Sequence, residues 1–373
     1  MGDTADTLIV GASAAGLATA AMLQQAGCAY ELLEAGDAVA SAWRNHYRRL
    51  HLHTPKSASG LPGLPMPRSW PRYPAREQVV EYLESYRAHF GIRPHFGEQV
   101  TLLERQTDGW AVTSSGGTWK ARNVVIATGA TRRAVRPTWP DADSYKGDVL
   151  HSSEFRDGEP WRGRTALVVG FGNSACEQAI DLVEHAVATH MSVRGGVNVL
   201  PRELLGIPIL QVGLVMGRLP PTLADLLAKP LLRLSVGDIT KLGLQRLPYG
   251  AMQQIASDQH IPLLDIGTIA HIKARRITIH GAIERFTPGG VVFTDGSDLD
   301  VDAVILGTGY RPALEDFLPE WQAVCDAQRR PLISGAPTAL PGLYFCGHHV
   351  TASGMLREIG AEAKRIATDL RQG

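Results

Sequence analysis

Two glycine-rich segments of the sequence have the spacing of a phosphate-binding loop. The first, residues 11–16, follows a short apolar run at 7–10 and fits G-x-G-x-x-G with Ser13 in place of the middle glycine. In this motif the backbone approaches a pyrophosphate at the electropositive N-terminus of a helix. About 20 residues further on, an acidic side chain accepts hydrogen bonds from a ribose, and Glu34 stands at that place. The pattern predicts dinucleotide binding by Gly11, Ser13, Ala14, Ala15, Gly16 and Glu34.

The second segment differs from the first in the charge that follows it. The apolar run 166–169 leads into Gly170, Gly172, Asn173, Ser174 and Ala175, and Arg194 stands where the first segment has its acid. An acid repels a 2′-phosphate, whereas a guanidinium binds it through a charge-assisted pair. Taken alone, Arg194 is an ordinary solvated charge at a strand end, but its register with the loop favours a phosphate contact. The first segment therefore suits FAD or NAD and the second suits NADP, which together predict electron transfer from NADPH to a flavin.

A third segment opens the C-terminal helix. Residues 353–357 precede a helical pattern that runs to about residue 370, and a predicted strand at 343–348 leads to it. The N-terminus of such a helix carries about half a unit of positive charge, which would stabilise an anionic reduced flavin ring. The same helix also serves to close the core, and the two roles are compatible.

The elements that position these segments form a β-turn-α-β unit that occurs twice. One unit covers strands at 7–10 and 30–33 with a helix at 17–25, and the other covers strands at 166–169 and 188–193 with a helix at 176–185. Strands at 124–129 and 304–309 end in glycine turns and indicate crossings between domains. We predict an α/β fold with two dinucleotide-binding, Rossmann-like domains. A discontinuous FAD domain (1–157 and 304–373) contains the inserted NADP domain (158–303).

Composition excludes several other classes of protein. Lys plus Arg equals Asp plus Glu, 37 against 37, so no basic field exists to bind nucleic acid. The four cysteines form no CxxC pair, which removes the redox relay of a disulfide reductase and indicates a reducing, cytoplasmic compartment. Neither histidine pair, 51 with 53 or 348 with 349, brings further ligands at metal spacing, so no metal site is expected.

The most apolar stretch, residues 204–217, is interrupted by Pro208 and Gln211 and is too short to cross a bilayer. We therefore expect no transmembrane segment. Whether the wider region 204–234 lines a substrate channel or contacts a membrane surface stays open.

One further motif carries a family resemblance. Tyr145, Gly147, His151 and Phe155 resemble the F-x-G-x-x-x-H-x-x-x-(F/Y) fingerprint of class B flavin monooxygenases. Phe155 is followed by Arg and Asp, where the Baeyer-Villiger branch has Trp, and this favours the flavin-containing branch proper. Seven further segments resemble YUCCA-type enzymes, which convert indole-3-pyruvate to indole-3-acetate with FAD, NADPH and oxygen: 41–44, 51–56, 73–75, 172–174, 199–203, 265–268 and 308–311.

The resemblance implies a role for individual residues. Residues 11–16 and Glu34 would hold the adenosine diphosphate of FAD with Val100 near the adenine, and Trp43 would lie beside the isoalloxazine ring. Residues 170–175 and Arg194 would hold NADP, while His151 and Phe155 would couple the domains. His53 stands where amine-oxidising members carry an asparagine, which argues against amine oxidation. The expected catalytic residues are Trp43, His53 and Asn173. Further cofactor contacts are expected at Arg44, Thr128, Gly129, Gly309, Gly347 and Met355.

The predicted activity is that of an FAD- and NADPH-dependent monooxygenase acting on a small molecule with molecular oxygen. Oxygen added to the reduced flavin gives a C4a-peroxyflavin, which retained NADP and a dry pocket protect. The substrate is an aryl α-keto acid such as indole-3-pyruvate, and the alternative is S- or N-oxygenation of a thioether or amine. The alternative of another class is a non-catalytic flavin-binding protein. The presence of Asn173, Ser174 and Arg194 argues against this alternative.

Overall fold

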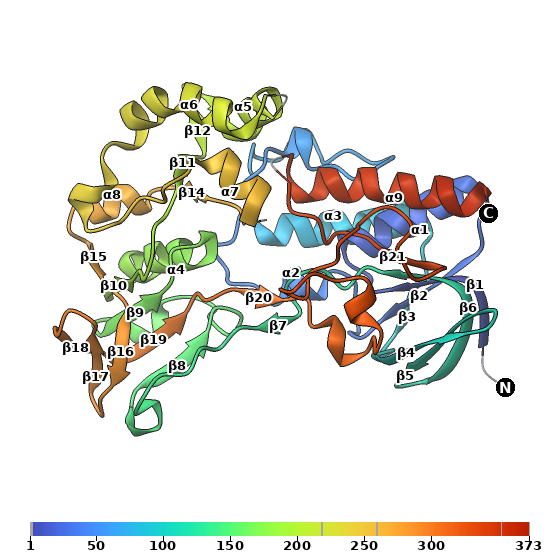
Figure 1. Cartoon of the computed structure of the whole chain (residues 1–373), viewed down its shortest axis with the longest axis horizontal. Coiled ribbons are helices and arrows are strands. Elements are labelled where there is room, and N and C mark those ends of the chain that lie inside the picture. The colour runs from blue at the N-terminus through green and yellow to red at the C-terminus, as the bar shows by residue number, and fades with distance from the viewer. Residues whose placement is uncertain (1–2, 218, 259, 352, 373) are drawn as a thin grey trace. The chain divides into compact units, whose positions relative to one another are not determined.

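The computed structural model describes residues 3–217, 219–258, 260–351 and 353–372 (Figure 1). The chain divides into two compact units, and neither is continuous in sequence. The first unit comprises Met1–Asn45, Thr54–Arg133 and Tyr310–Gly373. The second comprises His46–His53 and Ala134–Gly309. Each unit contains a parallel sheet and one of the two predicted loops.

The sheet of the first unit has a parallel part and an antiparallel part. Its strand order is β3-β2-β1-β6-β5-β4, and β21 also pairs with β6. The parallel strands are β1 (Asp3–Val10), β2 (Tyr30–Glu34), β3 (His95–Phe96), β6 (Gly117–Ile126) and β21 (Leu343–Phe345). Strands β4 (Val100–Gln106) and β5 (Gly109–Ser114) form an antiparallel meander with β6. Predicted site residues directly follow β1, β6 and β21, and these three parallel strands end at the same edge of the sheet.

Two long helices cover this sheet and pack against each other, as Figure 1 shows: α1 (Ala14–Ala26) and α9 (Met355–Gln372). Every residue of α1 from Ala14 to Leu23 is buried, because most are small enough for close approach on all sides. Helix α9 buries one stripe of residues at helical spacing, which are mostly apolar but include Glu362. The unit also contains α2 (Ser41–Arg44) and α3 (Arg76–His89).

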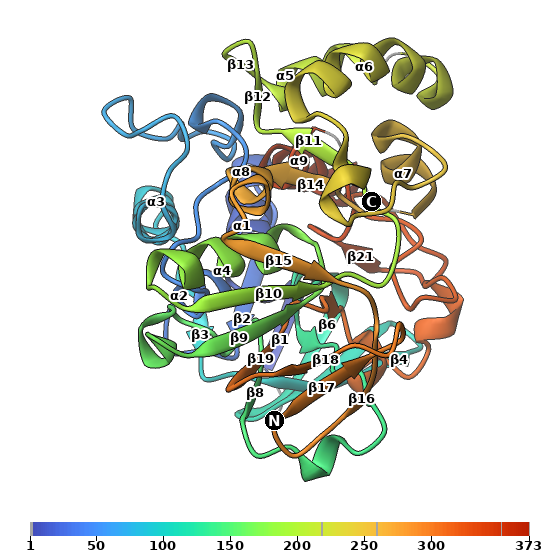
Figure 2. The same cartoon turned by 90° about the vertical axis from the view of Figure 1, so that its left-hand side faces the viewer.

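The second unit is built on a five-stranded sheet that is parallel throughout (Figure 2). The order is β15-β10-β9-β19-β8, with β8 (Asp148–His151), β9 (Thr165–Val169), β10 (Ala188–Ser192), β15 (Ile277–His280) and β19 (Ala303–Leu306). Helix α4 (Asn173–Glu184) connects β9 to β10. The central strands β9 and β19 are almost fully buried, as expected for a parallel sheet covered on both faces. Three antiparallel strands follow, β16 (Ile283–Phe286), β17 (Gly290–Phe293) and β18 (Asp298–Asp300).

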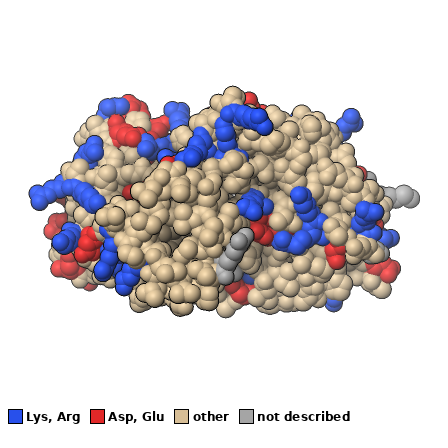
Figure 3. Space-filling model, turned by 90° about the horizontal axis from the view of Figure 1, so that it is seen from above, with Lys and Arg blue, Asp and Glu red and all other residues tan. Residues whose placement is uncertain are grey.

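Between β10 and β15 the chain forms a mainly helical insertion. Its elements are β11 (Val199–Pro201), β12 (Glu203–Leu204), β13 (Ile207–Pro208), α5 (Ile209–Met216), α6 (Pro221–Val236), α7 (Ala251–Asp258), β14 (Leu263–Asp265) and α8 (Thr268–Lys273). Eight large apolar side chains of this region are exposed: Leu205, Ile207, Val215, Leu223, Leu226, Leu227, Leu231 and Leu234. Figure 3 views the side on which α5 and α6 lie, and broad uncharged areas separate its charged side chains. Across the described residues, no helix is both long and apolar enough to span a membrane.

The remaining elements are short. They are β7 (Arg133–Ala134), β20 (Tyr310–Arg311) and six single-turn 3-10 helices at Lys56–Ala58, Ala142–Ser144, Glu159–Trp161, Ile239–Leu242, Leu314–Asp316 and Trp321–Ala323.

The predicted architecture of two Rossmann-like domains, one inserted into the other, is confirmed. The compact units divide at different residues from the predicted 157/158 and 303/304 boundaries. Strand β8 pairs in parallel with β19, and this pairing places the chain from Ala134 to Gly309 in the second unit. Phe155 is part of that unit's core, where its ring stacks on Trp161 at 5.9 Å. The separate segment His46–His53 also belongs to the second unit.

Candidate functional site

The loop of the first unit tolerates no side chain at two of its glycines. Gly11 has a φ of 104°, and a Cβ there would lie 2.9 Å from the carbonyl oxygen of Ala127. At Gly16 a Cβ would lie 1.8 Å from the carbonyl oxygen of Gly11. Glycine is therefore required at both positions, once for its backbone conformation and once for the close contact of loop and helix.

The N-terminus of α1 is open toward this loop. Ser13 is the N-cap residue, but its side chain makes no capping hydrogen bond, and the first turn contains no acidic residue. The first N–H groups of a helix have no partner within the helix, and here no capping side chain supplies one. Together with the helix dipole they favour a bound anion such as a pyrophosphate.

Glu34 connects the end of β2 to the loop through a hydrogen bond. Its Oε2 accepts a hydrogen bond from the backbone N–H of Ala12 at 2.6 Å. Its Oε1 accepts from the N–H of Gly36 at 2.9 Å and from the Ser41 hydroxyl at 3.2 Å. A carboxylate has about four acceptor positions, so a ribose hydroxyl remains a possible further donor. Glu34 thus supports the shape of the loop in addition to its predicted ribose contact.

Two side chains whose polar atoms are buried and lack a well-formed hydrogen bond follow the strands next to the loop. Strands β6 and β21 pair in parallel, and Thr128 and His348 follow their carboxyl ends. Neither the Thr128 hydroxyl nor a His348 ring nitrogen makes a well-formed hydrogen bond with any described residue. Buried polar groups are normally paired, so unpaired ones need an explanation. A polar ligand at the carboxyl ends of these strands would supply the partners, and the ribityl and phosphate groups of FAD fit that requirement.

Burial of His348 should make stability depend on pH. Burial lowers the pKa of His348 from 6.5 to about 4, and a smaller opposing effect comes from the Ile126 carbonyl. Because the folded pKa is the lower one, the folded and unfolded states bind equally few protons above pH 6.5. Between pH 6.5 and about 4 only the unfolded state gains a proton, and the protein loses up to about 3 kcal/mol of stability.

The measurement is urea unfolding of the FAD-loaded protein at a series of pH values, for the wild type and for His348→Leu. We expect the difference in unfolding free energy between the two proteins to change over pH 6.5 to 4 in favour of the variant. Parallel pH profiles of the two proteins would contradict the assignment.

Other residues predicted to contact FAD are distributed around the first unit. Trp43 and Arg44 lie on α2, and the Arg44 guanidinium donates to the Val39 carbonyl at 3.0 Å and pairs with Glu84. Val100 begins β4 and is buried. Gly129, Gly347 and Met355 lie after β6, after β21 and at the start of α9, respectively. A Cβ at Gly347 would lie 2.9 Å from the Cβ of Ala15, which brings Gly347 against the first turn of α1.

The loop of the second unit repeats this construction. Gly170 has a φ of 115°, and a Cβ there would lie 2.5 Å from the carbonyl oxygen of Gly307. A Cβ at Gly307 would lie 2.5 Å from the Cβ of Ala175, the counterpart of the Gly347 contact in the first unit. Gly172 is the N-cap residue of α4 and has no capping side chain. The second unit therefore presents another open helix N-terminus to an anion.

Asn173 and Arg194 have different surroundings. Asn173 begins α4, and its Oδ1 accepts a hydrogen bond from the backbone N–H of Leu264 at 2.8 Å. This bond fixes the side chain and leaves its NH₂ group as a donor. Arg194 lies two residues after β10, is exposed, and has no ion pair or hydrogen bond with any described residue. Such an unpaired guanidinium is suited to a 2′-phosphate.

His151 connects β8 to the chain that follows β19. The ring is fully buried, with Nε2 3.1 Å from the Gly309 carbonyl oxygen and Nδ1 3.0 Å from the Ser153 hydroxyl. Burial lowers the pKa of His151, which keeps the imidazole neutral, and the Gly309 carbonyl acts in the opposite direction. A neutral, doubly engaged imidazole serves to hold these two segments together. The coupling of the two domains predicted for His151 stays a prediction, because His151, Ser153 and Gly309 all belong to the second unit.

His53 lies against α4. Its Nε2 is 2.7 Å from Oε1 of Glu177, whose side chain is 2% exposed. His53 and Asn173, two of the predicted catalytic residues, thus belong to the same compact unit. Trp43, the third, belongs to the other unit.

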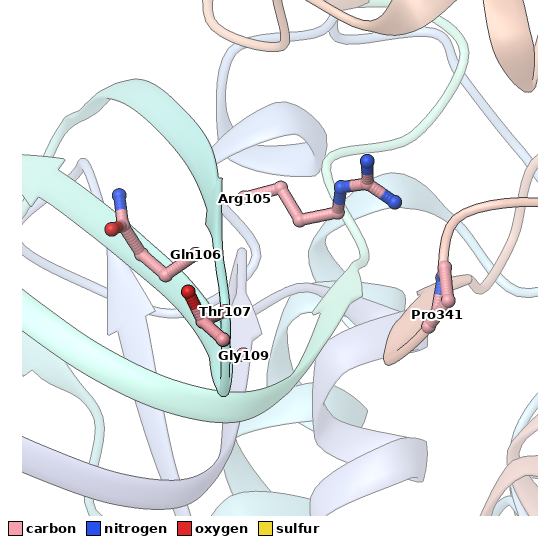
Figure 4. Close-up of a pocket in the computed structure, with 5 residues that line it drawn as sticks. All are labelled: Arg105, Gln106, Thr107, Gly109 and Pro341. Atoms are coloured by element: carbon pink, nitrogen blue, oxygen red, sulfur yellow. The ribbon is translucent and has the colours of Figure 1, made fainter.

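One cavity of the first unit lies away from these residues. It measures about 520 Å³ and is lined by Arg105, Gln106, Thr107, Gly109 and Pro341, at the turn between β4 and β5 (Figure 4). No predicted site residue lines it, and it contains no acid–base pair. We assign it no part in the site.

Three residues of these sites were not predicted from the sequence. Gly307 follows β19, and the Gly-x-Gly pattern of 307–309 was the signal for it. His348 appeared in the sequence only as one of two adjacent histidines without further ligands at metal spacing. Glu177 had no signal beyond its place on the helix after the second loop, because only the fold shows that it is buried against His53.

Comparisons with known proteins agree with this construction. A family model described as pyridine nucleotide-disulphide oxidoreductase matches residues 8–200. The chain is 38% identical to the probable indole-3-pyruvate monooxygenase YUCCA7 of Arabidopsis thaliana over 330 residues, covering 84% of this chain and 76% of that protein. It is 36% identical to the indole-3-pyruvate monooxygenase YUCCA1 of Oryza sativa subsp. japonica over 373 residues, covering 97% and 90%.

A solved structure shares the fold. The flavin-containing monooxygenase from Stenotrophomonas maltophilia superposes with a TM-score of 0.76 at 22% identity, covering 99% of this chain and 98% of that one. FAD and NADPH, the two cofactors that the loops predict, are those of this class of enzyme. The chain belongs to the YUCCA family of flavin-dependent monooxygenases.

Proposed function

We propose that this monooxygenase acts on an aryl α-keto acid such as indole-3-pyruvate. The overall reaction consumes the keto acid, O₂, NADPH and a proton, and yields the shortened carboxylic acid, CO₂, NADP⁺ and water. The observation that carries the proposal is 36–38% identity, over most of the chain, to proteins that bear the name indole-3-pyruvate monooxygenase. His53, in place of the asparagine expected for amine oxidation, agrees with it.

In this proposal the first unit holds FAD. The backbone of residues 11–16 and the N-terminus of α1 bind the pyrophosphate, and Glu34 binds a ribose hydroxyl. Thr128 and His348 donate to or accept from the polar chain of the cofactor, and Val100 borders the adenine. Contacts from Trp43, Arg44, Gly129, Gly347 and Met355 complete the set. Bound FAD supplies the oxygen-activating chemistry.

The second unit holds NADPH and contains two of the expected catalytic residues, His53 and Asn173. Residues 170–175 and the N-terminus of α4 bind the pyrophosphate, and Arg194 binds the 2′-phosphate. Asn173 keeps a free NH₂ group for hydrogen bonding. Gly309 contributes the carbonyl oxygen that contacts Nε2 of His151. The imidazole of His53 is proposed to orient the substrate or the nicotinamide by hydrogen bonding. We further propose a cytoplasmic location, which the four free cysteines support.

The proposal is tested by NADPH oxidation and oxygen uptake with purified, FAD-loaded protein. The substrates are indole-3-pyruvate, a thioether and a tertiary amine, each with and without catalase. We expect indole-3-pyruvate to stimulate NADPH oxidation above the substrate-free rate and to give close to one indole-3-acetate per NADPH. Stimulation by the thioether or amine, and none by the keto acid, would replace the keto acid with the S- or N-oxygenating alternative.

A further inference from the structure

A buried carboxylate lies beside the proposed active-site imidazole. Glu177 is on α4, and its side chain is 2% exposed, while that of His53 is 19% exposed. Oε1 of Glu177 lies 2.7 Å from Nε2 of His53. The contact has the distance of an ion pair but not the angles of a regular hydrogen bond, and among the described residues neither carboxylate oxygen has a hydrogen bond or a second ion-pair partner. His53 is therefore the one charged-group contact of the buried Glu177 carboxylate among the described residues.

The energetics of burial determine what this contact does. An ionised carboxylate without a partner in a protein interior costs several kcal/mol, so Glu177 requires a donor. The imidazole is the group that provides one, and this places a proton on Nε2. The other ring nitrogen, Nδ1, is buried and has no hydrogen bond with any described residue. Nδ1 is then the ring atom left for a ligand.

The chain around His53 runs along α4 and is attached to it twice. Arg49 pairs with Glu184 near the end of the helix, and His53 pairs with Glu177 nearer its start. The segment His46–His53 thus runs antiparallel to α4, toward the second loop. Asn173 and Glu177 are four residues apart and share one face of the helix. The contact between His53 and Glu177 therefore places His53 against the face of α4 that begins with Asn173.

We propose that Glu177 is a positioning residue for His53. Its carboxylate holds the ring orientation, keeps the proton on Nε2, and anchors the 46–53 segment to the helix that follows the NADP loop. This inference rests on the proposed function only in giving His53 a role in turnover. The orientation and the proton position are properties of the chain and are measurable without the reaction.

The test uses an isosteric substitution and a matched control. Glu177→Gln removes the charge and keeps the shape, whereas Glu184→Gln removes the ion pair between Arg49 of the 46–53 segment and α4. Glu184 is half exposed and outside the proposed site, so its ion pair contributes little. His53→Asn identifies the His53 signal, and the double variant Glu177→Gln/His53→Asn completes a thermodynamic cycle.

The first measurement is ¹⁵N NMR of the histidine rings in FAD-loaded protein. We expect the wild type and Glu184→Gln to show a protonated Nε2 at His53, and Glu177→Gln to show a changed ring signal. Because this readout reports the proton on one ring, general loosening of the fold does not produce it. An unchanged His53 signal in folded Glu177→Gln would overturn the proposal, whatever the enzyme oxidises.

The second measurement is the steady-state rate with the substrate that supports turnover. Loss of this ionic contact, taken to be as strong as a hydrogen bond to a charged group, predicts a fall in kcat of about 10- to 150-fold for Glu177→Gln, with little change in KM for NADPH. The double variant should be no slower than His53→Asn, since both changes remove the same function. Additive losses in the double variant would show that Glu177 acts independently of His53. Absence of keto-acid turnover in the wild type would contradict the proposed substrate and leave the NMR result intact.

Discussion

Ser13→Glu should abolish tight binding of FAD. Ser13 is the N-cap residue of α1 in the first loop, and its side chain makes no hydrogen bond to the helix that would be lost. The substitution places a carboxylate where the pyrophosphate is expected. Two unit charges about 4 Å apart near a protein surface repel each other by about 4 kcal/mol, or about a thousandfold in affinity.

The measurement is the flavin content of the purified protein and the affinity of the apoprotein for added FAD. Gln24→Glu is the matched control, because it adds the same charge to an exposed position near the other end of α1. The control should bind FAD like the wild type. A folded Ser13→Glu protein that retains full FAD would show that the flavin is not held at this loop.

Arg194→Ala should narrow the preference for NADPH over NADH by about 10- to 150-fold. The loss corresponds to one charge-assisted hydrogen bond of roughly 1.5 to 3 kcal/mol. Because Arg194 is exposed and has no partner among the described residues, its removal should leave the fold unchanged. The substitution should weaken the binding of NADPH and not that of NADH, since NADH has no 2′-phosphate. The coenzyme preference of Arg194→Lys should lie between those of the wild type and Arg194→Ala, because an ammonium keeps the charge without the planar geometry of a guanidinium.

Flavin reduction followed in a stopped-flow instrument gives the affinity for each coenzyme. Arg162→Ala serves as the control, since it removes another arginine of the same unit, from an exposed ion pair with Glu159. Its coenzyme preference should equal that of the wild type. Equal use of NADPH and NADH by the wild type would contradict the phosphate role of Arg194.

The elements around the two loops follow from local patterns in the sequence. Apolar runs at 7–10 and 166–169 predicted strands that the structure shows as β1 and β9, although β1 begins earlier, at Asp3. The predicted helices appear as α1 and α4 and begin three residues earlier in each case. The first turn of each helix consists of small residues that pack on the loop, and such turns carry little apolar periodicity.

The parts that the sequence did not predict depend on contacts between distant residues. Strand β8 belongs to the second unit because it pairs with β19, more than 150 residues away, and no local signal marks that pairing. The second role of Glu34, hydrogen bonding to its own loop, depends on how β2 ends beside Ala12. Glu177 is an ordinary helical residue in the sequence, and its burial against His53 appears only in the folded chain.

We expect this chain to transfer an oxygen atom from O₂ to an aryl α-keto acid. The most direct measurement is turnover of indole-3-pyruvate under ¹⁸O₂ in the presence of catalase, with mass analysis of the products. The products should be indole-3-acetate that carries one ¹⁸O atom and CO₂ that carries none. Unlabelled indole-3-acetate would contradict this expectation, because the new oxygen atom would then come from water. Loss of the reaction on addition of catalase would also contradict it, because leaked hydrogen peroxide would then be the oxidant.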